Sequence, residues 1–128
     1  MGIYTHICLG TNDVKRAQRF YDAALAPLGI RNLGNFQDQG IGYGKDVAEL
    51  LILRPLDGRA ATPANGGTVS FQASTRAAVD CFHARGLAAG GTDAGAPGSR
   101  GAVVNAYGAY LFDPDGNKIC AYCFKANG

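Results

Sequence analysis

The segment YGAYLFDPDGNKICAYCF, residues 107–124, decides the fold. Its two ends, residues 107–112 and 118–124, are rich in the aromatic and apolar residues that β-strands prefer. Between them, residues 113–117 have the composition of a tight turn, because Pro114 fixes φ and Gly116 supplies a positive φ without steric cost. The segment therefore predicts an antiparallel β-hairpin close to the end of the chain.

The composition of the whole chain indicates one compact domain. The chain has 128 residues, of which 47% are hydrophobic and 17% are charged, and this is enough to build one hydrophobic core. The net charge is only +2 and no basic run is present, which argues against nucleic acid as a partner. No apolar run has the length of a membrane span or of a signal peptide, so we expect no membrane partner and a cytoplasmic location.

The four cysteines are expected to be reduced thiols, because no export signal is present. Cys120 and Cys123 have the C-x-x-C spacing of redox proteins. They fall inside a predicted strand, where an odd separation sends two side chains to opposite faces of the sheet. The spacing therefore predicts neither a dithiol switch nor a zinc site, since no second pair is present.

The first half of the chain predicts a strand, a helix and three strands. Residues 3–9 alternate as a strand does, and Asn12 or Asp13 can cap a helix that extends to Leu28 and ends at Gly29. Three short strands are expected at residues 30–36, 40–44 and 48–54. The last is almost continuously apolar, which is typical of a central strand.

The second half repeats this order. A strand is expected at residues 68–73, and Ser74 or Thr75 can cap a second helix that ends at Gly90. Its predicted apolar stripe comprises Ala78, Val79, Phe82, Leu87 and either Ala84 or Arg85, with His83 at the surface. A loop at residues 93–101 and a short strand at residues 102–105 then lead to the hairpin.

The repeated order predicts the fold class and the organisation of the domain. We expect an α+β protein of two βαβββ modules with mostly antiparallel pairing, forming a paired, barrel-like cleft. The single domain, residues 1–128, would comprise a module at 1–56, a linker at 57–66 and a second module at 67–128.

Several short segments, in this order, resemble the vicinal oxygen chelate superfamily. They are residues 5–7, 17–21 with 28–29, 66–71, 90–91, 95–100 and 110–117. This superfamily includes glyoxalase I, bleomycin-resistance proteins, extradiol dioxygenases and fosfomycin-resistance thiol transferases. The resemblance covers essentially the whole chain. It implies paired βαβββ modules around a cleft, and in metal-dependent members a divalent ion held by the first and last strands of each module.

The ligand positions that the resemblance implies are only partly filled by metal-binding residues. The first-strand position of the first half matches His6, while its counterpart in the second half is Thr68. The closing-strand position of the second half is Cys120, and in the first half it is Glu49 or Leu50. Octahedral divalent sites need several oxygen or imidazole ligands. We therefore expect no metal cofactor; if a divalent metal is bound, His6, Glu49 and Cys120 are its candidate ligands.

The resemblance also implies a ligand-binding cleft between the modules. Its candidate ligand-binding residues are His6, Thr68, Arg100, Tyr107 and Cys120, with Arg100 at the mouth. Tyr107 and Tyr110 should face opposite ways, so only one of them can line the cleft. Strand alternation places Ser70 on the side of Thr68 and Tyr122 on the side of Cys120. It places Ile119, Ala121 and Cys123 beneath the helices.

Three functions remain open at the level of the sequence. The chain could be a glyoxalase/bleomycin-resistance-like protein with a degenerate metal site that binds a small molecule in the cleft. It could instead be a divalent-metal-dependent lyase or dioxygenase of the glyoxalase type. A dimeric scaffold with an empty cleft is the third hypothesis. The resemblance and the commonness of twofold symmetry favour a homodimer, and the identity of the ligand stays open.

Overall fold

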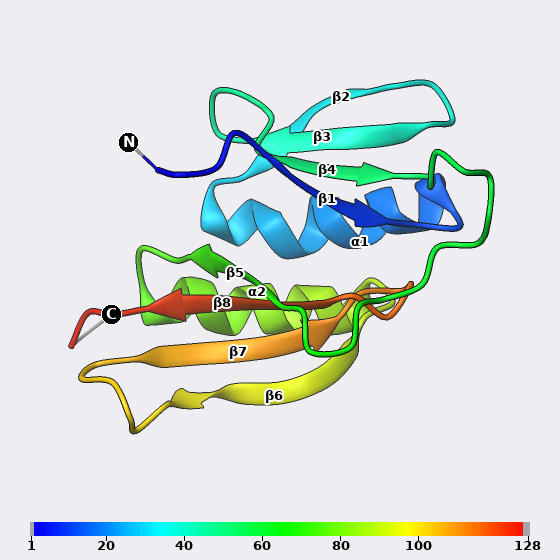
Figure 1. Ribbon diagram of the computed structural model, residues 1–128. Coiled ribbons are helices and arrows are strands. Elements are labelled where there is room, and N and C mark those ends of the chain that lie inside the picture. The colour runs from blue at the N-terminus through cyan, green and yellow to red at the C-terminus, as the bar shows by residue number, and fades with distance from the viewer. Residues whose placement is uncertain (1, 127–128) are drawn as a thin grey trace.

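The computed structural model describes residues 2–126 and contains two modules with the same order of elements (Figure 1). The elements of the first module are β1 (Ile7–Gly10), α1 (Val14–Leu25), the short 3₁₀ helix η1 (Ala26–Leu28), β2 (Arg31–Asn35), β3 (Gly40–Gly44) and β4 (Leu50–Leu53). The elements of the second module are β5 (Val69–Gln72), α2 (Arg76–Ala88), β6 (Thr92–Ser99), β7 (Tyr107–Phe112) and β8 (Lys118–Cys123).

Each module forms its own four-stranded mixed sheet. The strand orders are β1-β4-β3-β2 and β5-β8-β7-β6, so the two sheets have equivalent topologies. The first strand of each module pairs in parallel with the last, and the other pairs are antiparallel. The prediction of an α+β fold with two βαβββ modules is confirmed, although no closed barrel forms. In the described residues 2–126, no helix has the length and apolarity needed to cross a membrane.

The hairpin that decides the fold is also confirmed. Tyr107 lies opposite Cys123, and Phe112 lies opposite Lys118. Gly116 at the turn has φ of 91°, a conformation that glycine adopts without steric cost. β4 lies inside the first sheet, in agreement with its continuous apolar sequence.

The first helix ends earlier than its sequence pattern predicts. Asp13 caps it, accepting a hydrogen bond from the backbone N–H of Arg16. The α-helical part stops at Leu25, and residues 26–28 form η1 with Pro27 in its first turn. Proline has no N–H to donate and clashes with the preceding turn, so a regular α-helix does not continue through it. Gly29 then ends the segment with φ of 76°.

The prediction of a strand from residue 3 is wrong for its first half. β1 begins at Ile7, so His6 precedes the strand. The first ladder bond runs from the N–H of Ile7 to the carbonyl of Glu49. Residues 3–6 have no such partner because β4 itself begins only at Leu50.

The prediction of a loop followed by a short strand before the hairpin is also wrong. Residues 92–99 form β6, and residues 102–105 lie in exposed turns. β6 is an edge strand, and its pairing with β7 shifts register twice, between Asp93 and Gly95 and between Gly95 and Gly98. Edge positions and bulges are where a sheet tolerates glycine and proline, so the loop-like composition of β6 concealed a strand.

The buried side of α2 differs from its predicted stripe. Its buried residues are Val79, Phe82, His83 and Gly86, whereas Leu87 is exposed. His83, predicted to be at the surface, is 8% exposed, and its Nε2 lies 2.8 Å from Asp93 Oδ1 on β6. A Cβ on Gly86 would overlap the side chain of Leu111. The absence of a side chain at Gly86 thus lets α2 lie close to Leu111 of β7.

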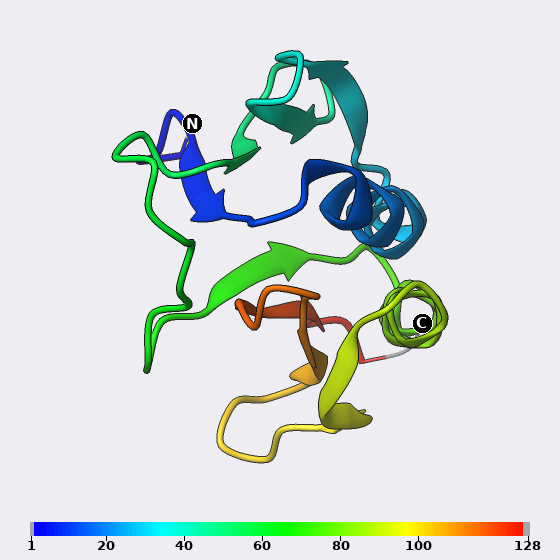
Figure 2. The same ribbon diagram turned by 90° about the vertical axis from the view of Figure 1, so that its right-hand side faces the viewer.

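The two helices pack against each other along one side of the molecule. Figure 2 shows them side by side, with one sheet curving over α1 and the other under α2. Phe20 of α1 is fully buried and lies against Gly86 and Gly91 of the second module. The cores of the two modules therefore form one continuous hydrophobic cluster.

The turn of the last hairpin binds the first module through two acidic residues. Asp115 Oδ2 accepts a hydrogen bond from the Thr11 hydroxyl at 2.5 Å, and Asp115 Oδ1 accepts from the backbone N–H of Asn12 at 2.9 Å. The Arg16 guanidinium donates to the same Oδ1 at 2.9 Å. The Asp115 side chain is only 2% exposed. Because water cannot solvate a buried carboxylate, these hydrogen-bond partners are needed to stabilise it.

Asp113 makes the second set of contacts in this turn. Its Oδ1 accepts from the backbone N–H groups of Asp115 and Asn117, which shapes the turn itself. Its Oδ2 accepts from the Tyr21 hydroxyl of α1 at 2.5 Å. Burial, with the Asp113 carboxylate beside it, raises the pKa of Tyr21 well above its usual range, so this hydroxyl keeps its proton and donates. The Asn117 amide reaches the carbonyl of Gly10 at the end of β1.

We predict that Asp115→Ala lowers the free energy of unfolding by about 3 kcal/mol, because it leaves buried donors of the first module without an acceptor. Chemical denaturation measures this change. Asp46→Ala, in the exposed turn between β3 and β4, is the matched control and should change stability by less than about 0.5 kcal/mol. Equal, small effects of both substitutions would contradict the assigned role of Asp115.

Candidate functional site

The candidate site lies on the face of the second sheet that points away from the helices, here called the outer face. Ile119, Ala121 and Cys123 of β8 point into the core, as strand alternation predicts. Cys120 therefore points to the outer face, where it pairs with Ser70 of β5 and Tyr110 of β7. Tyr122 follows on the same face of β8. We call Ser70, Tyr110, Cys120 and Tyr122 the outer-face site.

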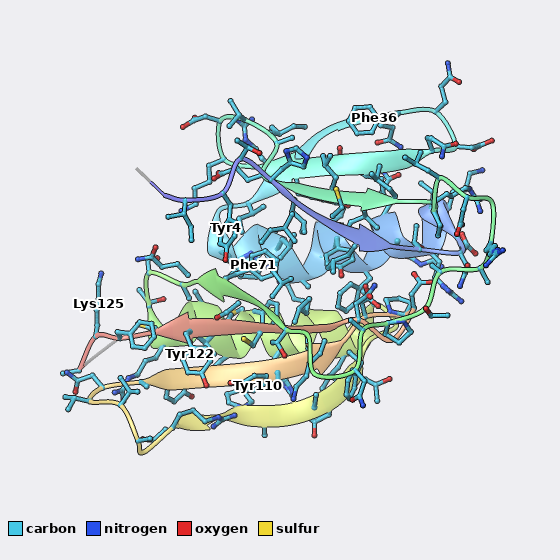
Figure 3. All side chains as sticks on the ribbon, viewed as in Figure 1. Tyr4, Phe36, Phe71, Tyr110, Tyr122 and Lys125 are labelled. Carbon is cyan, nitrogen blue, oxygen red and sulfur yellow. The ribbon has the colours of Figure 1, made fainter. Side chains whose placement is uncertain are left out.

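The two tyrosines of the outer-face site form a polar pair on an apolar surface. Their hydroxyl oxygens are 2.5 Å apart, and their rings meet edge to face with centroids separated by 5.8 Å. Figure 3 shows them on the neighbouring strands β8 and β7. The hydrogen bond with Tyr122 raises the pKa of Tyr110 to about 12. Tyr110 is therefore protonated at neutral pH and can take part in hydrogen bonding as a neutral hydroxyl.

The Cys120 thiol is protonated as well. Cys120 is 2% exposed, and burial raises its pKa above the usual value, although the hydrogen bond with Ser70 opposes this shift. The thiolate is the nucleophilic form of cysteine and the form that binds metals. Cys120 is therefore expected to act as a small apolar side chain in the wall of the site and not as a reactive thiol.

Two cations lie close to the ring of Tyr110. The Lys118 ammonium is 5.1 Å from the ring centroid, and the Arg100 guanidinium carbon is 5.5 Å from it. The Arg100 guanidinium also donates hydrogen bonds to the carbonyls of Ala96, Gly98 and Ser99. Arg100 is thus engaged in holding the end of β6. Lys118, within the described part of the chain, forms no ion pair, so its charge is available to a ligand.

A hollow of about 540 Å³ lies beside two residues of the outer-face site, Ser70 and Tyr122. Ser70 and Tyr122 line it from the sheet, and Phe124 lies stacked on Tyr122 with ring centroids 5.6 Å apart. The other walls come from the loop after β6, including Arg100, Val103 and Ala106. Volume and lining are in the range of small-molecule sites.

The residues predicted for the cleft are distributed over several parts of the structure. His6 is exposed before β1, and its Nδ1 lies 3.0 Å from the Thr5 hydroxyl. Thr68 is exposed and lines a separate groove with Pro63 and Lys118. Tyr107 lies on the helix side of β7, where its hydroxyl donates to Asp80 of α2. Among the hydrogen bonds of residues 2–126, none joins His6, Thr68 and Cys120.

The donor set does not fit a divalent metal ion. Across the described residues, no three His, Cys, Asp or Glu side chains come together as a metal-binding group. Glu49 is exposed where β4 begins, while the thiol of Cys120 is held in its protonated form on the other sheet. Divalent sites of this kind need several deprotonated or imidazole ligands, and His6, Glu49 and Cys120 do not supply them together.

Sequence reasoning predicts the face on which part of the candidate site lies, and it omits one residue. Alternation along the strands places Tyr122 with Cys120 and Ser70 with Thr68, and it leaves Tyr110 as the alternative to Tyr107. Lys118 is not among the predicted site residues, although the predicted hairpin, with its turn at residues 113–117, has the register that places Lys118 near Tyr110.

Comparison with solved structures returns proteins with the same arrangement. A glyoxalase/bleomycin resistance protein from Albidiferax ferrireducens T118 is 40% identical, with a TM-score of 0.86, over 95% of this chain and 98% of that chain. A glyoxalase-related enzyme from Fulvimarina pelagi is 19% identical, with a TM-score of 0.75, over 96% of this chain and 88% of that chain.

A lactoylglutathione lyase from Agrobacterium tumefaciens is 20% identical, with a TM-score of 0.66, over 96% of this chain and 94% of that chain. At such identities, the Fulvimarina and Agrobacterium structures show a shared fold and no more. Neither a protein-family model nor a curated protein matches this sequence.

We predict that iodoacetamide at about pH 8 alkylates two of the four cysteines rapidly, because reactivity follows exposure and thiolate fraction. Cys8 and Cys81 are exposed, whereas Cys120 and Cys123 are buried. Mass spectrometry of timed samples identifies the modified residues, and protein unfolded in urea provides the control in which all four react. Alkylation of Cys120 as fast as Cys81 would contradict a protonated, shielded thiol.

Proposed function

The chain belongs to the glyoxalase/bleomycin resistance protein family of the vicinal oxygen chelate superfamily, and from this premise we propose that it binds a small molecule on the outer-face site without a resident metal ion. The ligand class is an aromatic or amphipathic molecule with an anionic end. The observation that carries the proposal is the Tyr110–Tyr122 hydroxyl pair beside an open, largely apolar hollow.

The apolar part of the ligand would contact aromatic side chains. Phe124 is 56% exposed although it stacks on Tyr122, and Val103 on the opposite wall is 56% exposed. Covering such surfaces removes apolar area from water, which favours binding. Aromatic rings also prefer stacked or edge-to-face neighbours, so a planar ligand is favoured over a branched aliphatic one.

Two kinds of polar group would orient the ligand. The hydroxyls of Tyr110 and Tyr122 can exchange hydrogen bonds with a carbonyl or hydroxyl group. The Lys118 ammonium lies over the Tyr110 ring. It lines the groove of Thr68 rather than the hollow, so it would attract the carboxylate, sulfonate or phosphate of a ligand that extends past Tyr110. Arg100, assigned by its sequence position to the mouth of the cleft, would act chiefly by holding the loop that forms one wall.

The absence of a fitting donor set separates this proposal from the alternative function. A metal-dependent lyase or dioxygenase of the glyoxalase type would need His6, Glu49 and Cys120 to act together. His6 and Glu49 are exposed in the first module, and Cys120 is buried in the second sheet. A binding function requires no such convergence and uses the residues where they lie.

We predict that 1-anilinonaphthalene-8-sulfonate, an aromatic anion, binds the outer-face site. In a two-dimensional NMR titration the largest amide shifts should fall on β8, β7 and residues 100–106. Lys118→Met should weaken binding about fivefold, the effect of losing one partly exposed ion pair. Lys15→Met, on the exposed side of α1, is the matched control and should leave affinity unchanged.

Two results would overturn the proposed function. Shifts confined to another part of the molecule would show that the outer-face site does not take aromatic anions. Near-stoichiometric manganese, iron, nickel or zinc in protein purified without a histidine tag would favour the metal-dependent alternative. In that case, His6→Ala should abolish the bound metal.

We also propose that the protein is a homodimer in which a second copy covers exposed apolar residues outside the ligand hollow. Val104 is 83% exposed, and on the first module Phe36 and Val47 are 48% and 66% exposed. Apolar patches of this kind are characteristic of interaction surfaces, and twofold symmetry is the commonest solution.

Sedimentation analysis at micromolar concentration checks this expectation. A dimer has twice the chain mass of 13.3 kDa, and Val104→Asp should shift the protein toward the monomer because it places a charge in the interface. A species of 13.3 kDa for the unmodified protein would contradict the dimer.

A further inference from the structure

The seam between the two modules is closed at one end and open at the other. β1 and β5 are the edge strands that border the seam, and they run in opposite directions (Figure 1). Where β1 ends, the β7–β8 turn closes the seam through the hydrogen bonds of Asp115 with Thr11 and Asn12. Where β1 begins, the equivalent turn is the β3–β4 turn, residues 45–49, and it forms no such bonds with the second module in the described chain.

A cavity of about 380 Å³ occupies the open end. Its apolar walls come from both modules and comprise Ile7, Ile30, Leu50, Val69 and Phe71. Four of these five side chains pack against the core yet remain partly exposed, as only Leu50 is fully buried. Figure 3 shows Tyr4 and Phe71 close together at this end of the seam, where Tyr4 is 69% exposed. The cavity therefore has an apolar floor and an aromatic rim.

The mouth of this cavity carries one cation and one anion. Lys45 and Glu49, at the two ends of the β3–β4 turn, both line it. In the described residues, neither side chain takes part in an ion pair, and neither charged group has a hydrogen-bond partner. The Lys45 stem lies along Gly29, which leaves its ammonium group at the opening. Opposite charges at one mouth complement a ligand that carries both an amine and a carboxylate.

We propose that this seam cavity binds a zwitterion with an apolar side chain, a hydrophobic or aromatic α-amino acid. The carboxylate of the ligand would contact Lys45, its ammonium group would contact Glu49, and its side chain would enter the apolar floor beside Phe71. Thr5 and Gln72, which also line the cavity, supply further hydrogen-bonding groups at the rim.

The seam cavity differs from the outer-face site in location and in chemistry. Its charged and aromatic residues are Tyr4, Lys45, Glu49 and Phe71, and none of these lines the hollow beside Tyr122. Ser70 lines both spaces, so substitutions of Ser70 would not separate them. The outer-face site presents a cation beside an aromatic pair, whereas the seam cavity presents both signs of charge. Of these two sites, the seam cavity is therefore the one expected to prefer a zwitterion over a singly charged ligand.

Three probes with the same phenyl group test this selection by NMR titration. They are L-phenylalanine, with both charges, 3-phenylpropionate, with the carboxylate alone, and phenethylamine, with the ammonium alone. We expect L-phenylalanine to bind about fivefold more tightly than either singly charged probe, the effect of one exposed ion pair. Its largest amide shifts should fall on residues 4–7, 45–50 and 69–72.

Substitutions with matched controls test the role of each group. Lys45→Met and Glu49→Gln should each weaken L-phenylalanine binding about fivefold and make it resemble one of the singly charged probes. Lys15→Met and Asp46→Asn, at exposed positions outside the cavity lining, should have no effect. Thr5→Trp should abolish binding by filling the mouth, and Thr62→Trp is the control for adding a large exposed ring.

Each outcome decides the proposal. Selective binding that is lost in the Lys45, Glu49 and Thr5 variants but kept in their controls supports it. Equal affinities for the three probes, shifts on β7 and β8 in place of the seam, or no binding of L-phenylalanine at millimolar concentration would overturn it. Because Lys118→Met should leave L-phenylalanine binding unchanged, failure of the outer-face proposal is distinguishable from failure of this one.

Discussion

Two buried carboxylates in the β7–β8 turn fix how the modules sit against each other. A buried carboxylate is stable only when its oxygens have hydrogen-bond partners, and most partners of Asp113 and Asp115 outside the turn belong to the first module. They lie where β1 ends and α1 begins, so satisfying them places the second hairpin against that junction. The packing of Phe20 against Gly86 and Gly91 then completes the contact between the helices. Polar groups thus fix how the two modules are placed against each other, and apolar side chains supply much of the buried area.

This way of joining the modules leaves their repeated architecture unequal at the two ends. The two sheets have the same strand order and equivalent parallel pairs, but in the described chain only the acids of the β7–β8 turn are buried and hydrogen-bonded to the other module. The β3–β4 turn has Lys45 and Glu49 at its ends, and both are exposed. The junction between the modules is therefore closed by hydrogen bonds at the end of β1 and open, with a cavity, at the beginning of β1. The difference between the ends arises from a few side chains and needs no difference in fold.

The sequence was informative wherever the deciding interaction is local. The Asp-Pro-Asp-Gly-Asn turn, the Asp13 cap and the alternation along β8 all depend on residues close together in the chain, and the structure agrees with each. The sequence pattern was misleading where the local structure depends on a residue that is distant in the chain. β6 is a strand despite its glycines and proline because it pairs with β7. His83 is buried, and its partner Asp93 belongs to β6, an element that the sequence pattern concealed. For the site, alternation identified the face of Cys120, but the predicted residues omitted Lys118, which lies over Tyr110.

Equivalent positions in the two modules carry opposite charges, which supports the proposal that the outer-face site binds an anion. Ile7 pairs with Leu50 in the first sheet, as Val69 pairs with Ile119 in the second. Glu49 and Lys118 therefore occupy equivalent positions, whereas the resemblance had matched Glu49 or Leu50 with Cys120. One module has a carboxylate where the other has an ammonium group. On the second sheet, Lys118 would repel a divalent cation, and Glu49 cannot compensate there because it lines the seam cavity of the other end instead. The same ammonium group would attract an anionic ligand, and the protonated Tyr110 hydroxyl and Cys120 thiol add no opposing negative charge. A lysine in one module at the position of a glutamate in the other is therefore consistent with the proposed anionic ligand of the outer face.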